Sequence, residues 1–364
     1  RGPVVVWGLL ASYPFGGMTW QVLHYLAGLR RLGFDVWYVE DTDEFSYDPV
    51  TFMPTWDPTE NAKLLDQFMR RIGLEDRWIV RVPSKQECLG AKDHRGLLQL
   101  YRDADEAINL CGAQEPRESH REIPCRDYLE TDPVKDQVAV SNGDKACIDM
   151  LSQFDHLFTY GENLGHTDCP VPIERFKWHK TRPPVEVRWW ETQQSPPSDA
   201  CLTSVANWKH SGKDVVWNGE TWRWSKHHEF LKFIGLPRQA RIPMELSVGA
   251  IDQQDRARLK DNGWQLQSSA RLQDPDAYRE YIRQSVGEFT VAKEQYVRPR
   301  SGWFSDRSVC YLASGRPVIT QDTAVGKFVP TGEGLFVYET MAGARDAIEA
   351  VAADYPKQCS AALE

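Results

Sequence analysis

The chain has 364 residues, 41% of them hydrophobic and 26% charged, and this length predicts two domains of about 150 to 200 residues, each large enough for its own core. Lysine and arginine number 43 and aspartate and glutamate 52, so the net charge is −9. With no basic run in the sequence, nucleic acid is not an expected partner. The eight cysteines contain no C-x-x-C pair, which fits neither a zinc site nor a dense disulfide framework and indicates reduced thiols in the cytoplasm.

The chain opens with a βαβ pattern. Val4 to Leu10 is continuously apolar and predicts a buried parallel strand. A loop with Gly16 and Gly17 leads to an amphipathic helix, and a second strand is expected from Phe34 to Val39. The G-x-G-x-x-G pattern of dinucleotide-binding enzymes is absent, which argues against a dehydrogenase. The first apolar run is too short to span a bilayer, and the glycine loop behind it favours a Rossmann strand over a signal peptide.

Three further features of this region have structural interpretations. His24 lies inside the first predicted helix and is expected to be structural. The Asp-Thr-Asp sequence at 41–43 follows a strand, and we interpret it as an ordinary turn rather than a metal-binding motif. Phe45 to Trp56 is aromatic and contains proline, which predicts an ordered surface loop.

Helices are expected at Asn61 to Ile72 and at Leu97 to Leu110, and strands at Arg126 to Pro133 and Phe154 to Tyr160. The carboxyl ends of strands are where open α/β sheets place their ligands.

Two acids and a histidine stand at these strand ends. Asp132 closes the first strand, and Glu162 and His166 lie in the glycine-bracketed loop after the second. Carboxylate and imidazole groups can exchange protons near neutrality, so Asp132 and Glu162 are candidate catalytic residues. An Asp-Pro turn and a solvated loop are the competing interpretations.

Prolines between Lys177 and Pro197 disfavour helix and place a domain boundary near residues 185–200. The second domain is expected to begin with a strand from Cys201 to Ala206. Ser225 is the predicted cap of the next helix, and Lys226 at its start makes a candidate phosphate contact. Three tryptophans between residues 217 and 224 either form core or stack on a sugar or base.

Strand and helix continue to alternate toward the C-terminus. The expected strands are 241–248, 264–266, 289–292, 318–320 and 335–338, and the expected helices are 255–261, 274–284 and 344–355. The predicted fold class is α/β, with a Rossmann-like domain at 1–190, a second at 200–345 and a C-terminal helix at 346–364.

The stretch from Arg298 to Tyr338 contains the strongest candidate site. Ser305 is the predicted N-cap of a short helix that ends at Gly315, and arginines lie on both sides of the cap. Free N–H groups at a helix N-terminus, next to arginines, favour bound phosphate. The candidate donor-binding residues of the second domain are Lys226, Lys293, Arg300, Ser305, Asp306, Arg307, Asp322, Thr323 and Gly326.

The sequence YLASGRPVITQDT, followed by GEGLFVY, resembles the donor-binding segment of GT-B glycosyltransferases. The resemblance implies two Rossmann-like domains facing each other across a cleft, with the acceptor-side domain first and the donor domain second. It implies metal-independent transfer of a sugar from a nucleotide-diphosphate sugar to a small-molecule or glycan hydroxyl. UDP is the expected nucleotide, with no cofactor and no metal.

The resemblance also implies roles for single residues. Lys226 occupies the place of the lysine that meets the donor diphosphate, and Gly16 and Gly17 match a glycine loop on the acceptor side, to which His166 is also assigned. Many of these enzymes hold the ribose with a glutamate where this chain has Cys310, and Asp306 is the expected replacement.

Asp132-Pro133 matches the closure of a segment that carries a histidine in retaining enzymes, but Glu130 and Thr131 stand in the place of that histidine. Retention and inversion both remain open. A nucleotide-sugar epimerase of the same fold, or a non-catalytic nucleotide-sugar-binding protein, are the alternative functions. The epimerase would change the donor without an acceptor, and the binding protein would turn nothing over.

Overall fold

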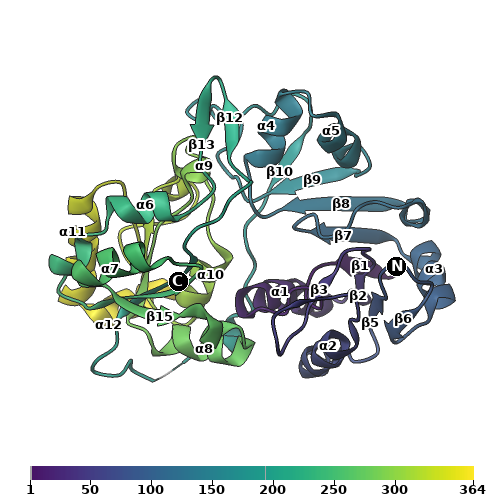
Figure 1. Cartoon of the computed structure of the whole chain (residues 1–364), viewed down its shortest axis with the longest axis horizontal. Coiled ribbons are helices and arrows are strands. Elements are labelled where there is room, and N and C mark those ends of the chain that lie inside the picture. Colours follow the sequence, from purple (N-terminus) through teal and green to yellow (C-terminus); the bar gives the residue numbers. More distant parts are fainter. Residues whose placement is uncertain (1, 193) are drawn as a thin grey trace. The chain divides into compact units, whose positions relative to one another are not determined.

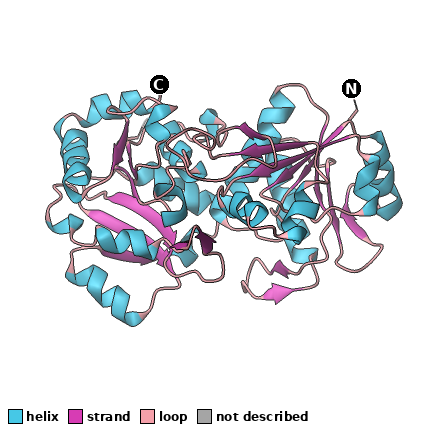
Figure 2. Cartoon of the chain, turned by 90° about the horizontal axis from the view of Figure 1, so that it is seen from above, coloured by secondary structure: helices cyan, strands magenta, loops and turns pink. Residues whose placement is uncertain are grey.

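The computed structural model describes residues 2–192 and 194–364, which fold into two compact units. The first unit contains the chain up to Asp132 together with 143–159 and 174–184. The second contains 133–142, 160–173 and everything from Val185 onward. Each unit is built on its own mainly parallel sheet (Figure 1), and helices flank the strands of both sheets (Figure 2).

The sheet of the first unit has eight strands in the order β10-β9-β8-β7-β1-β2-β5-β6, and all pairs are parallel except β5 with β6. The strands are β1 Val4–Trp7, β2 Val36–Glu40, β5 Trp78–Arg81, β6 Cys88–Gly90, β7 Glu106–Leu110, β8 Cys125–Glu130, β9 His156–Thr159 and β10 Trp178–Lys180. The helices are α1 Gly16–Arg31, α2 Thr59–Arg71, α3 His94–Asp103 and α5 Lys145–Leu151, and a small hairpin pairs β3 Ser46–Tyr47 with β4 Pro54–Thr55.

Two predictions in this unit are wrong in part. The expected helix 97–110 ends at Asp103, and its second half is strand β7, because Ala104 leaves helical geometry and the segment pairs with both β1 and β8. Pairing on both sides satisfies the backbone N–H and C=O groups of β7, so this segment does not need the hydrogen bonds of the helix that its apolar spacing predicted. Gly16 and Gly17 form the first turn of α1 rather than a loop.

The sheet of the second unit has six parallel strands in the order β15-β14-β11-β16-β17-β18. The strands are β11 Leu202–Asn207, β14 Met244–Gly249, β15 Gln265–Ser268, β16 Gly287–Thr290, β17 Val318–Gln321 and β18 Leu335–Tyr338. The helices are α4 Lys135–Ser141, α6 His227–Lys232, α7 Gln253–Asp261, α8 Pro275–Gln284, α9 Glu294–Val297, α10 Asp306–Ala313, α11 Met341–Ala353 and α12 Tyr355–Ala362, and β12 Val215–Trp217 pairs with β13 Glu220–Trp222.

Numbered by their order along the chain, these six strands run 3-2-1-4-5-6, which is the Rossmann order. The direction of the strand order therefore changes between β11 and β16. In open α/β sheets this switch point, at the carboxyl ends of the strands, is the expected place of a ligand.

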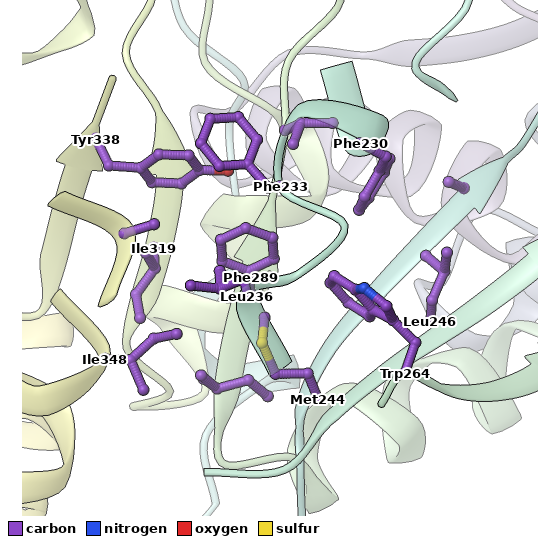
Figure 3. Close-up of a cluster of buried hydrophobic side chains, with 14 of the residues drawn as sticks. Phe230, Phe233, Leu236, Met244, Leu246, Trp264, Phe289, Ile319, Tyr338 and Ile348 are labelled. Atoms are coloured by element: carbon purple, nitrogen blue, oxygen red, sulfur yellow. The ribbon is translucent and has the colours of Figure 1, made fainter. Parts of the chain in front are cut away.

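An aromatic core holds the central strands of the second unit in place (Figure 3). Phe289 on β16 is fully buried and stacks on Tyr338 of β18, with ring centroids 5.3 Å apart and an interplanar angle of 13°. Trp264 contacts the same phenyl ring at 6.0 Å. The core thus fixes β16, and with it the residues that β16 presents at the switch point.

No described helix is both long and apolar enough to cross a membrane. All eight cysteines are free thiols.

We expect Phe289→Ala to lower the free energy of unfolding by about 3–5 kcal/mol, because it opens a cavity in this core. Urea denaturation measures the change. Val216→Ala is the control, since Val216 is 56% exposed on the β12 hairpin and its loss should cost less than about 0.5 kcal/mol. Equal losses for the two variants would contradict the placement of Phe289 at the centre of the core.

Candidate donor-binding site

Three cations gather at the switch point of the second unit. Lys226 stands in the segment after β11, Lys293 follows the end of β16, and Arg307 lies in the first turn of α10. Burial lowers the pKa of Lys226, and the nearby charges of Arg307 and Lys293 lower it further. We call Lys226, Lys293 and Arg307 the basic cluster.

Arg307 is fixed to the sheet by three hydrogen bonds. Its Nε donates to the Glu288 carboxylate at 2.6 Å, and its terminal nitrogens donate to the carbonyl of Val205 at 2.8 Å and to the hydroxyl of Thr290 at 2.9 Å. Burial disfavours the charged guanidinium, but the fully buried Glu288 outweighs this effect and raises the pKa of Arg307. Two of the five N–H donors of Arg307 remain for a ligand.

Lys226 is compensated only in part, by the charges of Glu288 and Asp306. Its side chain keeps part of its surface exposed but is enclosed by protein, and it forms no ion pair with any described residue. Burial, followed by the charges of Arg307 and Lys293, lowers its pKa to about 7. Its ammonium lies 5.8 Å from the centre of the Trp303 ring. The site therefore has an excess of positive charge before any ligand binds.

The local structure around Lys226 differs from the prediction. Ser225 does not cap α6, because its hydroxyl donates to the carbonyl of Trp208 at 3.1 Å, and Lys226 itself occupies the N-cap position. Since α6 has only six residues, attraction for an anion at this point comes from the lysine and its neighbours rather than from the helix.

Lys293 lies on the face of an aromatic side chain. Its ammonium is 3.1 Å from the centre of the Trp224 ring and donates to the Tyr296 hydroxyl at 2.9 Å. Trp222 and Trp224 are 3% and 7% exposed. These two tryptophans therefore form core, and one face of Trp224 holds a cation by a cation–π contact.

Helix α10 begins as predicted. The Ser305 hydroxyl accepts a hydrogen bond from the N–H of Arg307 at 3.2 Å, so Ser305 is the N-cap. Asp306 is half-buried in the first turn. Cys310 is 2% exposed, and its Sγ donates to the carbonyl of Asp306 at 3.2 Å. Of these two positions, Asp306 is the one that keeps exposed surface.

A second group of polar contacts joins the donor segment to the loop after β9. Arg300 contacts the carboxylates of Asp168 at 3.3 Å and Asp322 at 3.4 Å, and Lys327 contacts Asp168 at 2.8 Å and the Asn163 side-chain oxygen at 2.6 Å. The pKa of Asp168 is lowered, and the hydrogen bond from Lys327 is the largest cause. We call Asn163, Asp168, Arg300, Asp322 and Lys327 the loop network.

The backbone of this region is also closely packed. Gly302 has φ +77°, and a Cβ there would lie 2.4 Å from the backbone nitrogen of Asn163, so only glycine fits. Thr323 is 1% exposed and donates to the carbonyl of Trp303 at 2.7 Å, which gives it a structural contact. Gly326 is exposed in the turn that contains Lys327.

The predicted acid and base residues fall into different units. Glu162, 9% exposed, belongs to the same loop as Asn163, and the exposed His166 packs edge-on against Phe328 with ring centroids 5.5 Å apart. Asp132 is exposed at the end of β8 in the first unit.

Gly16 and Gly17 also lie in the first unit. The structure therefore brings Glu162 and His166 to the loop network of the second unit, and leaves Asp132 and the two glycines in the first.

The Asp-Thr-Asp sequence at 41–43 follows β2 as predicted, but it is part of an ion-pair network rather than an ordinary turn. Asp41, 3% exposed, pairs with Arg81 and accepts a hydrogen bond from Tyr101 at 3.1 Å. Asp43 contacts Arg81 and Arg117, each at 2.7 Å. Arginines therefore neutralise both carboxylates, and neither carboxylate is free to bind a metal ion.

His24 is structural, as predicted. It is 3% exposed in α1, and burial lowers its pKa to about 3, so the ring is neutral at physiological pH.

Comparisons with solved structures identify the fold. An alpha-glucosyltransferase in complex with UDP matches 100% of this chain and 94% of its own, with a TM-score of 0.55 and 10% identity. Anabaena Alr3699/HepE in complex with UDP-glucose matches with a TM-score of 0.54 and 11% identity, over 100% and 93% of the two chains. An alpha-glucosyltransferase in complex with UDP and a 13-mer DNA matches with a TM-score of 0.54 and 10% identity, over 100% of this chain and 93% of its own.

This chain has the GT-B fold of these glycosyltransferases, with Rossmann-like units. No protein-family model matches its sequence, and no curated protein sequence matches it.

Sequence reasoning missed several residues of the site, namely Glu288, Asn163, Asp168, Lys327 and Trp303. Glu288 had a usable signal, because an acid inside the apolar strand Gly287–Thr290 requires a cation partner once the strand is buried. The missed members of the loop network, Asn163, Asp168 and Lys327, had none, since they come from segments that are far apart in sequence.

We expect Lys226→Met to raise the melting temperature, because it removes from the protein interior a cation that its surroundings compensate only in part. The folded-state pKa of about 7 lies below the ordinary 10.5, so the destabilisation is fully present below pH 7 and is relieved as the pH rises through 7 toward 10.5. The gain should therefore be larger at pH 6 than at pH 9. A variant less stable than wild type at pH 6 would show that Lys226 has a partner in the fold.

Arg307→Ala should lower the free energy of unfolding by about 3–5 kcal/mol, because it leaves Glu288 charged and buried without its partner. Adding Glu288→Gln should restore part of the loss. Denaturation of both variants measures the coupling, and equal stabilities for the single and double variants would contradict it.

Proposed function

We propose that this protein is a metal-independent glycosyltransferase that moves a sugar from a nucleotide-diphosphate sugar, with UDP as the nucleotide, to a hydroxyl of a small molecule or glycan. The observation that carries the proposal is the basic cluster at the switch point of the second unit. The alpha-glucosyltransferase and HepE structures of the same fold were determined with UDP or UDP-glucose, which supports a nucleotide sugar as the ligand.

The basic cluster suits a diphosphate leaving group. A diphosphate bound beside Lys226 and Lys293 supplies negative charge that Glu288 and Asp306 provide only in part, and the remaining N–H donors of Arg307 can hydrogen-bond to its oxygens. In the transition state charge builds up on the departing phosphate, where fixed cations stabilise it most. The N-terminus of α10, capped by Ser305, contributes its dipole.

The other candidate residues take roles around this centre. Asp306 is assigned to the ribose hydroxyls, because Cys310 is buried. The loop network is assigned to one side of the donor site. Its members Arg300 and Asp322 line that side together with the turn at Thr323 and Gly326.

Glu162 or Asp132 is assigned to orient the acceptor hydroxyl and take its proton. His166, Gly16 and Gly17 are assigned to the acceptor side.

Metal independence is supported by the charges present. The basic cluster provides the cationic charge that a metal ion would otherwise bring to a diphosphate, and the acids at 41 and 43 are paired with Arg81 and Arg117. No cofactor is proposed beyond the nucleotide sugar. The eight free thiols support a cytoplasmic location.

The acceptor is proposed not to be nucleic acid. One alpha-glucosyltransferase of the same fold was solved with DNA, but this chain carries a net charge of −9, which disfavours binding to a polyanion. Fluorescence anisotropy with labelled duplex DNA at low salt tests this point, and submicromolar binding would contradict it.

We expect UDP to raise the melting temperature more than GDP, dTDP or UMP does, and Lys226→Ala to weaken UDP binding by about 1.5–3 kcal/mol, or roughly ten- to a hundredfold. Calorimetry measures the affinity, with the exposed Lys260→Ala as control. An unchanged affinity in Lys226→Ala would remove Lys226 from the site.

UDP affinity should also fall as the pH rises above about 7, because Lys226 loses its proton in the free protein and must regain it to pair with phosphate. Lys226→Arg should abolish this dependence, because its side chain stays charged. A wild-type pH profile that Lys226→Arg does not change would contradict the assignment.

Turnover separates the three functions. UDP release that depends on an added acceptor indicates transfer. Epimerised donor without an acceptor, detected by NMR, indicates an epimerase, and binding with no change in the donor indicates a binding protein.

A further inference from the structure

A separate group of metal-ligating side chains lies in the first unit, at the amino ends of neighbouring strands. Cys125 is the first residue of β8 and Asp127 the third, while His156 begins β9 and Glu106 begins β7. These strands lie side by side in the sheet (Figure 1). The amino end of a parallel sheet is opposite to the end where such folds place their substrates.

The strand register puts all four side chains on one face of the sheet. Glu106 is paired with Cys125, and Asp127 with His156. Paired residues of parallel strands share a face, and so do residues two apart in one strand. The arrangement therefore follows from the fold and does not depend on a flexible loop.

The three closest donor atoms are separated by the distances found within one coordination sphere. Cys125 Sγ lies 3.6 Å from Asp127 Oδ1 and 3.7 Å from His156 Nδ1, and these last two atoms are 2.9 Å apart. A tetrahedral zinc ion with bonds of about 2.3 Å to sulfur and about 2.0 Å to nitrogen or oxygen sets its ligands about 3.5 Å (S to N or O) and about 3.3 Å (N to O) apart. A few tenths of an ångström of movement would let all three bind one ion.

The charges around these atoms also favour a cation. The carboxyl of Glu106 is hydrogen-bonded to that of Asp127, so two acids lie in contact. No described lysine or arginine forms an ion pair with Asp127, whose only such partner is His156. This differs from the acids at 41 and 43, which arginines neutralise. A divalent ion would relieve the repulsion between the two carboxyls.

The group is open to solvent on one side. The His156 side chain is 50% exposed and that of Asp127 is 11% exposed, so an ion can enter without unfolding. A thiolate, an imidazole and a carboxylate together suit zinc better than magnesium or calcium, which prefer oxygen ligands alone.

We propose that Cys125, Asp127 and His156 bind one divalent ion of the zinc class, with Glu106 or a water molecule as the fourth ligand. On binding, the Cys125 thiol releases its proton to solvent and its sulfur forms the bond to the metal, while the neutral His156 ring carries its proton on Nε2 so that Nδ1 can bind. The ion joins β8 to β9 and stabilises the first unit. This site is independent of the proposed donor site.

The test uses the full chain, freed of metal with a chelator and then titrated with Zn²⁺ or Co²⁺ alone. We expect one Zn²⁺ per chain by calorimetry, a higher melting temperature with Zn²⁺, and a thiolate-to-cobalt charge-transfer band in the ultraviolet spectrum with Co²⁺. Cys125→Ser should abolish the band and the thermal shift. Cys88→Ser is the matched control, because Cys88 lies on the edge strand β6, with β7, β1, β2 and β5 between it and β8, and its replacement should leave both unchanged.

Two further variants keep the proposal falsifiable if Cys125→Ser folds poorly. His156→Gln, at a half-exposed position, should weaken Zn²⁺ binding by more than about 100-fold, and Glu106→Gln by about 10- to 100-fold, as expected for a neighbour or weak ligand. No cobalt–thiolate band in wild type, a band that survives Cys125→Ser, or equal Zn²⁺ affinity in wild type and His156→Gln would each overturn the proposal.

Discussion

The buried ion pair between Arg307 and Glu288 is the constraint on which the candidate donor site depends. A charged carboxylate in the middle of a central strand is tolerated only with a partner, and Arg307 is that partner. The same guanidinium also binds β11 through the carbonyl of Val205, so one side chain fixes the start of α10 against two strands at the switch point. Burial lowers the pKa of Lys226, and the charge of Arg307, held in place by Glu288, lowers it further.

Charged groups that have a partner of opposite charge in the fold have a structural role here, whereas charged groups without a full partner mark the candidate sites. Asp41 and Asp43 in the first unit are as acidic as any metal motif, but Arg81 and Arg117 balance them, and they hold the carboxyl end of β2 in place. Lys226 in the second unit forms no ion pair with a described carboxylate, and the charges of Glu288 and Asp306 offset burial and the neighbouring cations only in part. A group left in this state destabilises the free protein, and a ligand of opposite charge recovers that free energy on binding.

The sequence predicted much of the fold, because apolar periodicity and capping are local. Ser305 was identified as a cap from its position before an apolar run, and β18 matches its prediction residue for residue. Local pattern failed at β7, where pairing with two neighbouring strands overrides a helical spacing. The site was predicted less well, because its decisive contacts are long-range: Glu288 meets Arg307 across 19 positions, and Cys125 meets His156 across 31. Cysteine spacing alone therefore indicated no metal site.

The two proposed sites are of opposite charge because they lie at opposite kinds of sheet edge. At the carboxyl ends of parallel strands the following helices begin, and their N-termini favour anions, as at α10. At the amino ends the preceding helices finish: α3 ends shortly before β7, and α5 shortly before β9. Helix C-termini carry partial negative charge and favour cations. The proposed phosphate site follows β11 and β16, and the proposed metal site precedes β7, β8 and β9. At each place the backbone of an α/β unit already favours the charge of the ligand.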